Sequence, residues 1–457
     1  MSERAFDVVV LGAGPAGEVV AGRLADNGAS VAVVEPHLVG GECSFYACMP
    51  SKALLRPAEV LAEARRTPGA AEAVDGRVDA AAALARRDEV IHDLDDESSV
   101  PWLTDKGIEL FRGAGRIDGE RRVVVGDDVL VADKAVVVAT GSYASMPPIE
   151  GLDDAEPWTN REATTAKEAP ARLIVIGGGV AGAELAQAWR SLGSQVTILE
   201  RGDRLLEREE PFAGDQVTDS LRAQGVDVRV DAAITGVTTS NGEVTVALEG
   251  EGAVTADALL VSAGRRPRTE DIGVESVGLE AGKPIEVDDR MRATAVDGGW
   301  LYAVGDVNGR IQLTHMGKYQ ARAAADVILG KEAEVTHDGP ISPRVTFTEP
   351  QVAAVGHTLA SAQQAGLNVR VVDVDVEGSA GGSFVGKDAV GTARIVVDED
   401  RRVIVGATFT GVEVAESLHA ATIAVVAEVP LDRLWHAIPS FPTRSELWLN
   451  LLEAYGL

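Results

Sequence analysis

Short, almost wholly apolar runs alternate along the chain with longer segments whose apolar residues recur at helical spacing. The first run, residues 6–11, is interrupted only by Asp7, and a helical pattern over 18–27 and a second run over 30–34 follow it. Apolar runs without polar alternation are typical of parallel strands that are buried on both faces. The pattern therefore predicts an α/β fold built from strand–helix–strand units.

The same unit occurs a second time, with a strand at 173–176, a helix at 183–192 and a strand at 195–199. Further elements are expected around the two units. They are a helix-rich region at 53–96 with a break near 67–69, strands of a smaller sheet at 109–112, 122–125 and 129–132, and buried strands at 135–139 and 258–263.

From residue 343 the pattern changes to short strands in which polar and apolar positions alternate. Strands are expected at 392–397 and 403–408, and a long helix with an apolar stripe at 413–426. Alternation indicates an antiparallel sheet, and an apolar stripe on a helix usually marks core or interface. The C-terminal part is thus predicted to be a separate α+β domain.

Each strand–helix–strand unit carries a glycine-rich turn and a terminal acid. In the first unit the turn is Gly12-Ala13-Gly14-Pro15-Ala16-Gly17 and the acid is Glu35; in the second it is Gly177-Gly178-Gly179-Val180-Ala181-Gly182 with Glu200. In both units 23 positions separate the first glycine from the acid. The glycines allow a pyrophosphate to approach the helix N-terminus, and the acid accepts from a ribose hydroxyl. Two such sites predict electron transfer between a flavin and a nicotinamide.

The only two cysteines among the 457 residues, Cys43 and Cys48, are close together and are followed by Pro50-Ser51-Lys52. A zinc site needs three or four ligands and no second pair exists, so no metal site is predicted. A redox-active dithiol and two inert core cysteines stay open as alternatives, with the redox interpretation favoured. A helix that starts just after Pro50 would lower the pKa of a nearby thiol.

Composition narrows the class of function. A net charge of −29, from 42 basic and 71 acidic residues, argues against nucleic acids and anionic membrane surfaces as partners. The sequence has no apolar run long enough to span a membrane and no signal-peptide pattern at its N-terminus. We therefore expect a cytoplasmic protein, in which a lone cysteine pair is more often catalytic than structural.

The stretch Gly40-Gly41-Glu42-Cys43, with Cys48 and Pro50-Ser51-Lys52, resembles the active-site disulfide motif of the class I pyridine nucleotide–disulfide oxidoreductases. That family includes glutathione reductase, dihydrolipoamide dehydrogenase and mercuric reductase, and usually has Thr in place of Glu42. The resemblance spans essentially the whole chain. It implies a homodimer with an FAD-binding domain (1–147), an NAD(P)-binding domain (148–265), a central domain completing the FAD site (266–338) and a dimer-interface domain (339–457).

The resemblance also implies roles for individual residues. Cys43 would exchange with substrate, Cys48 would contact the flavin, and Lys52 would pair with Glu184 beside the nicotinamide. The first glycine turn would bind FAD and the second the nicotinamide nucleotide. The cofactor-binding residues that it implies are Gly12, Gly14, Pro15, Ala16, Gly17, Glu35, Gly41, Ala114, Thr140, Gly141, Arg266, Asp306, Leu313, Thr314, Gly177, Gly179, Gly182, Glu200 and Gly264.

The second turn favours NADH over NADPH. Its last glycine is Gly182, and the carboxylate of Glu200 would accept from a 2′-hydroxyl but repel a 2′-phosphate. Arg201 and Arg204 follow closely in the sequence, so NADPH remains the alternative.

The C-terminal end departs from the family. The family's reductases have His-Pro-Thr-x-x-Glu there, with a His that acts as acid and base across the dimer and a Glu that orients it. This chain has Phe441-Pro442-Thr443-Arg444-Ser445-Glu446, so Glu446 stays a catalytic candidate while Phe441 replaces the His. His436 is a conceivable substitute. The expected acceptor is a low-molecular-weight disulfide. The alternatives are quinones or metal ions reduced directly from the flavin, or a redox-sensing protein with structural cofactors, which Lys52, Glu184 and the cysteines argue against.

Overall fold

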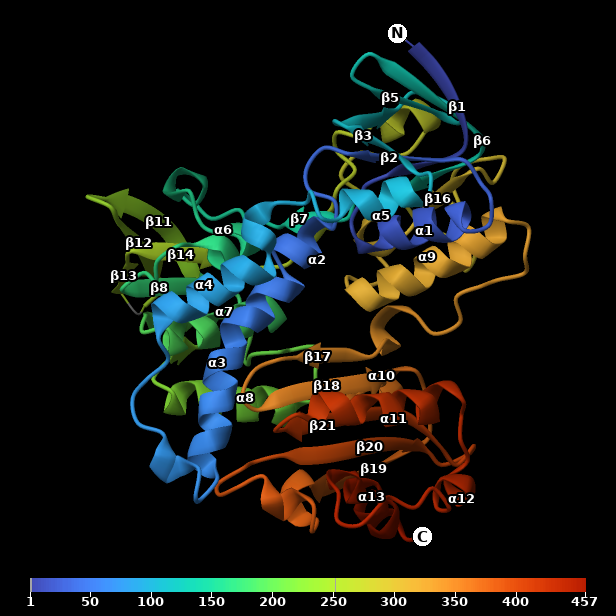
Figure 1. Cartoon of the computed structure of the whole chain (residues 1–457). Coiled ribbons are helices and arrows are strands. Elements are labelled where there is room, and N and C mark those ends of the chain that lie inside the picture. The colour runs from blue at the N-terminus through green and yellow to red at the C-terminus, as the bar shows by residue number, and fades with distance from the viewer. Residues whose placement is uncertain (1, 251) are drawn as a thin grey trace. The chain divides into compact units, whose positions relative to one another are not determined.

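The structure is a computed structural model that describes residues 2–250 and 252–457 (Figure 1). By their internal contacts the residues fall into two units. Unit 1 contains the chain up to Pro50 together with Asp88–Ser145 and Gly264–Pro340, and unit 2 contains Ser51–Arg87, Met146–Ala263 and Ile341–Leu457. These two units do not correspond to the four predicted domains, since each unit contains parts of several of them. The predicted domain boundaries therefore remain predictions.

A mainly parallel sheet lies at the centre of unit 1. Its middle strand, β1 (Ser2–Leu11), pairs in parallel with β2 (Val31–Glu35) and with β6 (Asp128–Val138). All five residues of β2 are buried, which explains why its sequence shows no alternation. Helices α1 (Pro15–Ala25) and α9 (Thr314–Ile328) lie side by side and share a core with these strands (Figure 1).

The other strands of this sheet are β3 (Glu109–Arg112), β4 (Gly115–Ile117), β5 (Arg122–Val125) and β16 (Leu301–Ala303). Unit 1 also contains the short helices α2 (Gly41–Phe45) and α5 (Val100–Asp105). A two-stranded antiparallel pair joins β7 (Ser142–Ala144) to β15 (Arg265–Pro267). These connections place the glycine turn, the cysteine segment and Asp306 in the same unit.

Two predictions for this region are wrong. The segments at 109–112, 122–125 and 129–132 do not form a smaller sheet, because β3 pairs with β2 and β5 pairs with β6 in the main sheet. Residues 129–132 and 135–139 also do not form two strands, since β6 runs through both. The polar pair Asp133-Lys134 suggests a break, but it lies where the β1–β6 register shifts, and Lys134 there pairs with Asp7 at 2.9 Å.

The second glycine turn belongs to a parallel sheet of unit 2. Here β8 (Arg172–Ile176) lies between β9 (Gln195–Leu199) and β14 (Ala258–Val261), with β10 (Asp227–Arg229) beyond β9. The helices of this part of the unit are α3 (Cys48–Arg66), α4 (Ala80–Val90), α6 (Asn160–Thr165), α7 (Val180–Ser191) and α8 (Pro211–Ala223). A separate antiparallel sheet is formed by β11 (Ile234–Ser240), β12 (Glu243–Leu248) and β13 (Gly252–Ala256).

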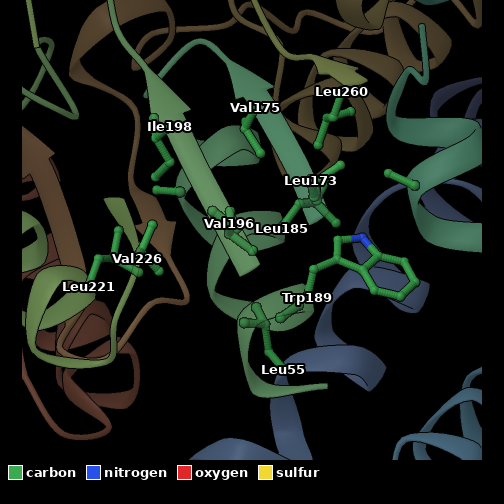
Figure 2. Packing of buried hydrophobic residues seen from close by; sticks show 14 of the residues in the cluster. Leu55, Leu173, Val175, Leu185, Trp189, Val196, Ile198, Leu221, Val226 and Leu260 are labelled. Atoms are coloured by element: carbon green, nitrogen blue, oxygen red, sulfur yellow. The ribbon is translucent and has the colours of Figure 1, made fainter. Parts of the chain in front are cut away.

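Trp189 of α7 anchors the core of this part of unit 2. It is fully buried and packs in one hydrophobic cluster with Leu55 of α3 and Leu173 of β8 (Figure 2). Its ring lies 5.9 Å from that of Trp158, at a tilted angle. Because α3 and α7 share this core, Lys52 of α3 and Glu184 of α7, both in unit 2, hold fixed positions relative to each other.

The C-terminal part of unit 2 is an antiparallel sheet covered by helices, as its alternation predicts. The strand order is β17 (Arg344–Thr346), β18 (Gln351–Gly356), β21 (Val403–Gly411), β20 (Thr392–Asp398) and β19 (Val369–Asp375). The helices are α10 (Leu359–Gln364), α11 (Val414–Val426), α12 (Leu431–Leu434) and α13 (Leu447–Tyr455). The predicted helix at 413–426 and the strands at 392–397 and 403–408 therefore coincide with α11, β20 and β21. The predicted α/β class is confirmed.

Candidate active site

Cys43 and Cys48 are brought into contact, with Thr314 beside them. Cys43 lies in α2, Cys48 is the first residue of α3, and a hydrogen bond joins the two thiols. The Sγ atom of Cys48 lies 3.4 Å from Oγ1 of Thr314, the first residue of α9. Both thiols are half-buried. This is the geometry that a dithiol switching between reduced and disulfide forms requires.

The environment of Cys43 opposes its ionisation. The hydrogen bond from Cys48 and burial raise the pKa of the Cys43 thiol, whereas Thr314 and the ammonium of Lys318 act in the opposite direction. The sequence prediction that a helix start lowers the thiol pKa is thus wrong for Cys43. The helix begins at Cys48 rather than after Pro50, and the hydrogen bond from Cys48 and burial raise the pKa of Cys43.

Lys318 is a residue near the dithiol that the sequence analysis missed. It lies one helical turn after Thr314 on α9, so both side chains project from the same face of the helix. Its charge also acts on Glu18 of α1, whose pKa burial raises and Lys318 lowers. The four-residue spacing from Thr314 is the only sequence signal that could have indicated it.

The first glycine turn leaves room for a phosphate group at one position only. A Cβ on Gly12 would lie 2.4 Å from the carbonyl oxygen of Ala139, and one on Gly17 would lie 1.9 Å from that of Gly12. A Cβ on Gly14 would make only an ordinary contact, with the Cα of Gly41 at 3.9 Å, so this position of the turn is the least crowded. Pro15 and Ala16 follow as the first residues of α1. This cradle fits the pyrophosphate of a dinucleotide at a helix N-terminus.

Glu35 closes the same turn from the end of β2. Its Oε2 accepts a hydrogen bond from the backbone N–H of Ala13, and its Oε1 accepts one from that of His37, both at 2.8 Å. Ala114 lies in the exposed loop after β3, next to Gly113, whose N–H donates to the Glu35 carbonyl. The carboxylate is therefore oriented by the backbone and retains lone pairs for a ribose hydroxyl.

The remaining residues predicted to bind FAD also lie in unit 1. A Cβ on Gly41 would lie 2.8 Å from the Cα of Gly14, so the cysteine segment runs directly against the glycine turn. Thr140 donates to the carbonyl of Arg268 at 2.7 Å, and Gly141 has a φ of +75°. Arg266 stacks over Tyr143 at 4.4 Å. Leu313 immediately precedes α9.

Asp306 itself is half-buried, with 27% of its side chain exposed. Burial raises its pKa, while a hydrogen bond from Ser142 and the charge of Arg265 lower it. Ser142 Oγ donates to Oδ2 of Asp306 at 2.6 Å. A half-buried carboxylate oriented in this way suits the recognition of hydroxyl groups of a cofactor.

The second glycine turn repeats the first in unit 2. Gly177 has a φ of +103°, a Cβ on Gly182 would lie 1.9 Å from the Gly177 carbonyl oxygen, and Gly179 faces open space. Glu200 accepts from the N–H groups of Gly178 at 2.5 Å and Gly202 at 2.6 Å. The donor set and the cradle again fit a dinucleotide. Gly264, also predicted to bind cofactor, lies outside this unit and has a φ of +112°.

Lys52 and Glu184 form the predicted ion pair. The Nζ atom of Lys52 lies 2.7 Å from Oε2 of Glu184, whose side chain is 3% exposed. Oε1 of Glu184 accepts from the N–H of Phe347 at 2.8 Å, and the Phe347 ring lies 4.8 Å from the Lys52 ammonium. The backbone and the ring therefore hold both charges in one place.

The C-terminal segment places no imidazole beside Glu446. Phe441 is 76% exposed, and Glu446 Oε2 accepts instead from the N–H of Gly381 at 3.3 Å. His436 is exposed and follows α12. The arrangement shows Glu446 binding the backbone of a neighbouring loop.

Comparison with protein families decides the class. The description "Pyridine nucleotide-disulphide oxidoreductase" applies to the family model that matches residues 6–321, and the dimerisation domain of the same family matches residues 342–451. The chain belongs to the pyridine nucleotide-disulphide oxidoreductase family. Members are FAD-dependent enzymes that use NAD(P)H, so the predicted family, enzyme class and cofactors are confirmed. The dimerisation domain supports the predicted homodimer.

Similar proteins span nearly the whole chain. A mercuric reductase of Staphylococcus aureus is 31% identical over 455 residues, covering 96% of this chain and 81% of that protein. A dihydrolipoyl dehydrogenase of Chlamydia muridarum is 31% identical over 452 residues, covering 97% and 95%. The two relatives carry different activities, so similarity at this level does not select an acceptor.

Solved structures agree with the fold. The Cu(II) complex of the HOCl-induced flavoprotein disulfide reductase RclA from Escherichia coli has a TM-score of 0.86 and 26% identity, covering 98% of this chain and 99% of that one. LpdA from Mycobacterium tuberculosis has a TM-score of 0.86 at 24% identity and supports the fold alone. Within residues 2–250 and 252–457, no helix has the length and apolar character needed to cross a membrane.

Proposed function

We propose that this enzyme passes electrons from NADH through FAD to the Cys43–Cys48 disulfide and on to a low-molecular-weight disulfide. The observation that carries the proposal is the contact between the two thiols, with Thr314 at the start of α9 beside Cys48. A cytoplasmic location fits this chemistry, because a reducing compartment supplies small disulfides that need constant reduction.

The cofactor would be held by residues of unit 1, namely the turn Gly12–Gly17, Glu35 and Asp306. When bound, FAD supplies hydride acceptance from a nicotinamide and two-electron delivery to a disulfide. The contribution of the chain's own residues is to hold the charged side chains of the site in fixed positions. The Lys52–Glu184 pair is held by the Phe347 backbone and ring and thus presents a fixed positive charge, with its proton, in the region assigned to nucleotide binding.

The exchange step belongs to Cys43. After the disulfide takes up two electrons, the Cys43 thiolate attacks one sulfur of the substrate disulfide and releases the first thiol. Cys48 then attacks the sulfur of Cys43, re-forms the internal disulfide and releases the second thiol. Two electrons and two protons thus convert one substrate disulfide to two thiols, and Thr314 supports the waiting sulfur of Cys48.

A specific observation favours a second candidate, the direct reduction of metal ions or quinones from the flavin. RclA, which is similar over nearly the whole chain, has a solved Cu(II) complex. Phe441 stands where a proton donor would assist disulfide exchange, and reduction of a metal ion needs no such donor. This route would bypass Cys43.

A Cys43→Ser variant separates the two candidates. It removes the exchanging thiol and keeps the cofactor cradle, so we expect disulfide reduction to stop while NADH-dependent reduction of a quinone or of Cu(II) continues. NADH consumption with each acceptor is the measurement. Cys48→Ser should in addition abolish the long-wavelength absorption that a thiolate beside a flavin produces on two-electron reduction. Disulfide turnover that survives in Cys43→Ser would overturn the proposal.

A further inference from the structure

Glu42, the residue directly before Cys43, is tied to Arg265 on a distant part of the chain. Glu42 lies in α2, which has five residues, and so short a helix depends on tertiary contacts. Its Oε2 atom lies 3.8 Å from Nη2 of Arg265, and the two side chains are 23% and 25% exposed. Both belong to unit 1. The turn that carries Cys43 is thus linked to the first residue of β15.

Further contacts fix the guanidinium of Arg265. Its Nε donates to Oγ of Ser142 at 2.7 Å, and its Nη2 donates to the Ser142 carbonyl at 2.8 Å. Ser142 Oγ donates in turn to Asp306, whose Oδ2 lies 3.9 Å from Nε of Arg265. A planar guanidinium suits several acceptors at once. Arg265 therefore lies between two carboxylates, Glu42 on one side and Asp306 on the other.

The charges of this group affect one another. The carboxylate of Glu42 raises the pKa of Asp306, and the guanidinium of Arg265 lowers it. A carboxylate close to a thiol disfavours the thiolate, and a guanidinium on that carboxylate cancels much of the effect. The ammonium of Lys318 already lowers the pKa of Cys43, and without Arg265 the carboxylate of Glu42, the residue directly before Cys43, would lose its partner guanidinium. The exchange step needs the Cys43 thiolate, so this balance bears directly on it.

We infer that Glu42 and Arg265 form a charge-balanced clamp that holds the Cys43 turn against Asp306 and keeps the Cys43 thiol able to ionise. The inference rests on the proposed function in one respect, that Cys43 is the exchanging thiol. Glu42 and Arg265 are positioning residues, because they act on exchange only through Cys43.

The test is the pH profile of Cys43 alkylation in the holoenzyme after two-electron reduction. Iodoacetamide is the probe, and peptide mass identifies the labelled cysteine. We expect Arg265→Gln to raise the apparent pKa of Cys43 by about one unit, which means about tenfold slower alkylation below that pKa. The double variant Glu42→Gln with Arg265→Gln should return the profile close to wild type, since the carboxylate next to Cys43 is removed with its partner.

Two variants serve as controls. Arg265→Lys keeps the positive charge and should leave the profile near that of wild type. Arg268→Gln removes one positive charge three residues further on, where the guanidinium faces Tyr143 at 5.8 Å, and should have no effect. FAD per polypeptide is measured for every variant, so that loss of cofactor is not mistaken for a shifted thiol.

An Arg265→Gln profile that superimposes on wild type overturns the clamp, and so does a double variant as slow as Arg265→Gln alone. If Arg265→Gln does not fold, Glu42→Gln tests the inference instead. This variant removes the carboxylate that balances the positive charge of Arg265, so it should lower the apparent pKa of Cys43. An unchanged Glu42→Gln profile then overturns the inference. Failure of the proposed function would appear elsewhere, as disulfide turnover in Cys43→Ser.

Discussion

At the scale of single residues, the two acids that end β2 and β9 show how far spacing can be trusted. Glu35 and Glu200 each bind two backbone N–H groups, one of them in the glycine turn of the same unit. Their positions could be predicted from the sequence, because the same spacing of 23 positions separates the first glycine of the turn from the acid at the end of the second strand in both units. Lys318 and Arg265 could not be placed in this way. Their partners, Cys43 and Glu42, are distant in sequence and meet them only through the tertiary fold.

Glu200 leads to a prediction about the nucleotide. A carboxylate at this position accepts from a 2′-hydroxyl and repels a 2′-phosphate. Arg204 does not counter it, since its guanidinium is engaged with the Glu207 carbonyl at 3.1 Å and Asp203 at 3.3 Å. We expect wild type to prefer NADH, and Glu200→Ala to weaken NADH and improve NADPH. The measurement is the rate of flavin reduction at equal low concentrations of each nucleotide. Faster reduction of the wild-type flavin by NADPH would contradict the assignment and point to Arg201 and Arg204.

At the scale of elements, continuous apolar runs predicted the positions of the buried strands correctly. Polar residues within a strand led to a wrong prediction of where that strand ends. β2, β8 and β9 lie where continuous apolar runs predict them, whereas Asp133-Lys134 divides β6 in the sequence but not in the structure. A register shift between two paired strands can accommodate a polar pair, and nothing local in the sequence marks such a shift. The sequence analysis also did not predict α2, because a five-residue helix carries too little periodicity to be recognised.

The packing of α3 on α7 gives a prediction about stability. Trp189 is fully buried and its indole N–H has no hydrogen-bond partner among the described residues, so its contribution is packing. Trp189→Ala should cost about 3–5 kcal/mol, as large-to-small changes in cores do. It should also slow flavin reduction, because Lys52 and Glu184 project from the two helices that Trp189 joins.

Thermal and denaturant unfolding followed by NADH-driven flavin reduction would measure both effects. Trp102→Ala is the matched control, since this tryptophan is 42% exposed, and a change below about 1 kcal/mol is expected there. A Trp189→Ala protein as stable as the control would show that the cluster closes over the gap, and that the helix pair does not depend on it.

At the scale of the whole molecule, the family and its cofactors could be predicted and the acceptor could not. The glycine turns and the segment from the cysteine pair to Lys52 are each contiguous in the sequence, so they can be recognised without the structure. The family resemblance implies that the group assisting exchange reaches the dithiol across the dimer, from the dimerisation domain that matches residues 342–451. There the sequence changes one residue, Phe441, and the structure shows its partner Glu446 bound to Gly381 instead.

Phe441 leads to the last prediction. A positioned acid or base contributes about 10²–10⁴-fold to a proton transfer, and a phenyl ring can neither donate nor accept a proton. Hydride transfer from NADH does not need that group, so flavin reduction should be fast. A leaving thiolate with a pKa of about 8.5 departs poorly without an acid, so turnover of glutathione disulfide or lipoamide should be slow. A disulfide with a more acidic leaving thiol should be reduced much faster.

Phe441→His tests this directly, because it returns an imidazole to a segment that still carries Glu446. We expect it to speed turnover of glutathione disulfide by about 10²-fold while flavin reduction and the mass of the dimer stay unchanged. His436→Ala is the competing test, since His436 lies five residues before Phe441 and is exposed. A fall of about a hundredfold in disulfide turnover of His436→Ala, with flavin reduction unchanged, would assign the proton to His436 and make Phe441 a packing residue.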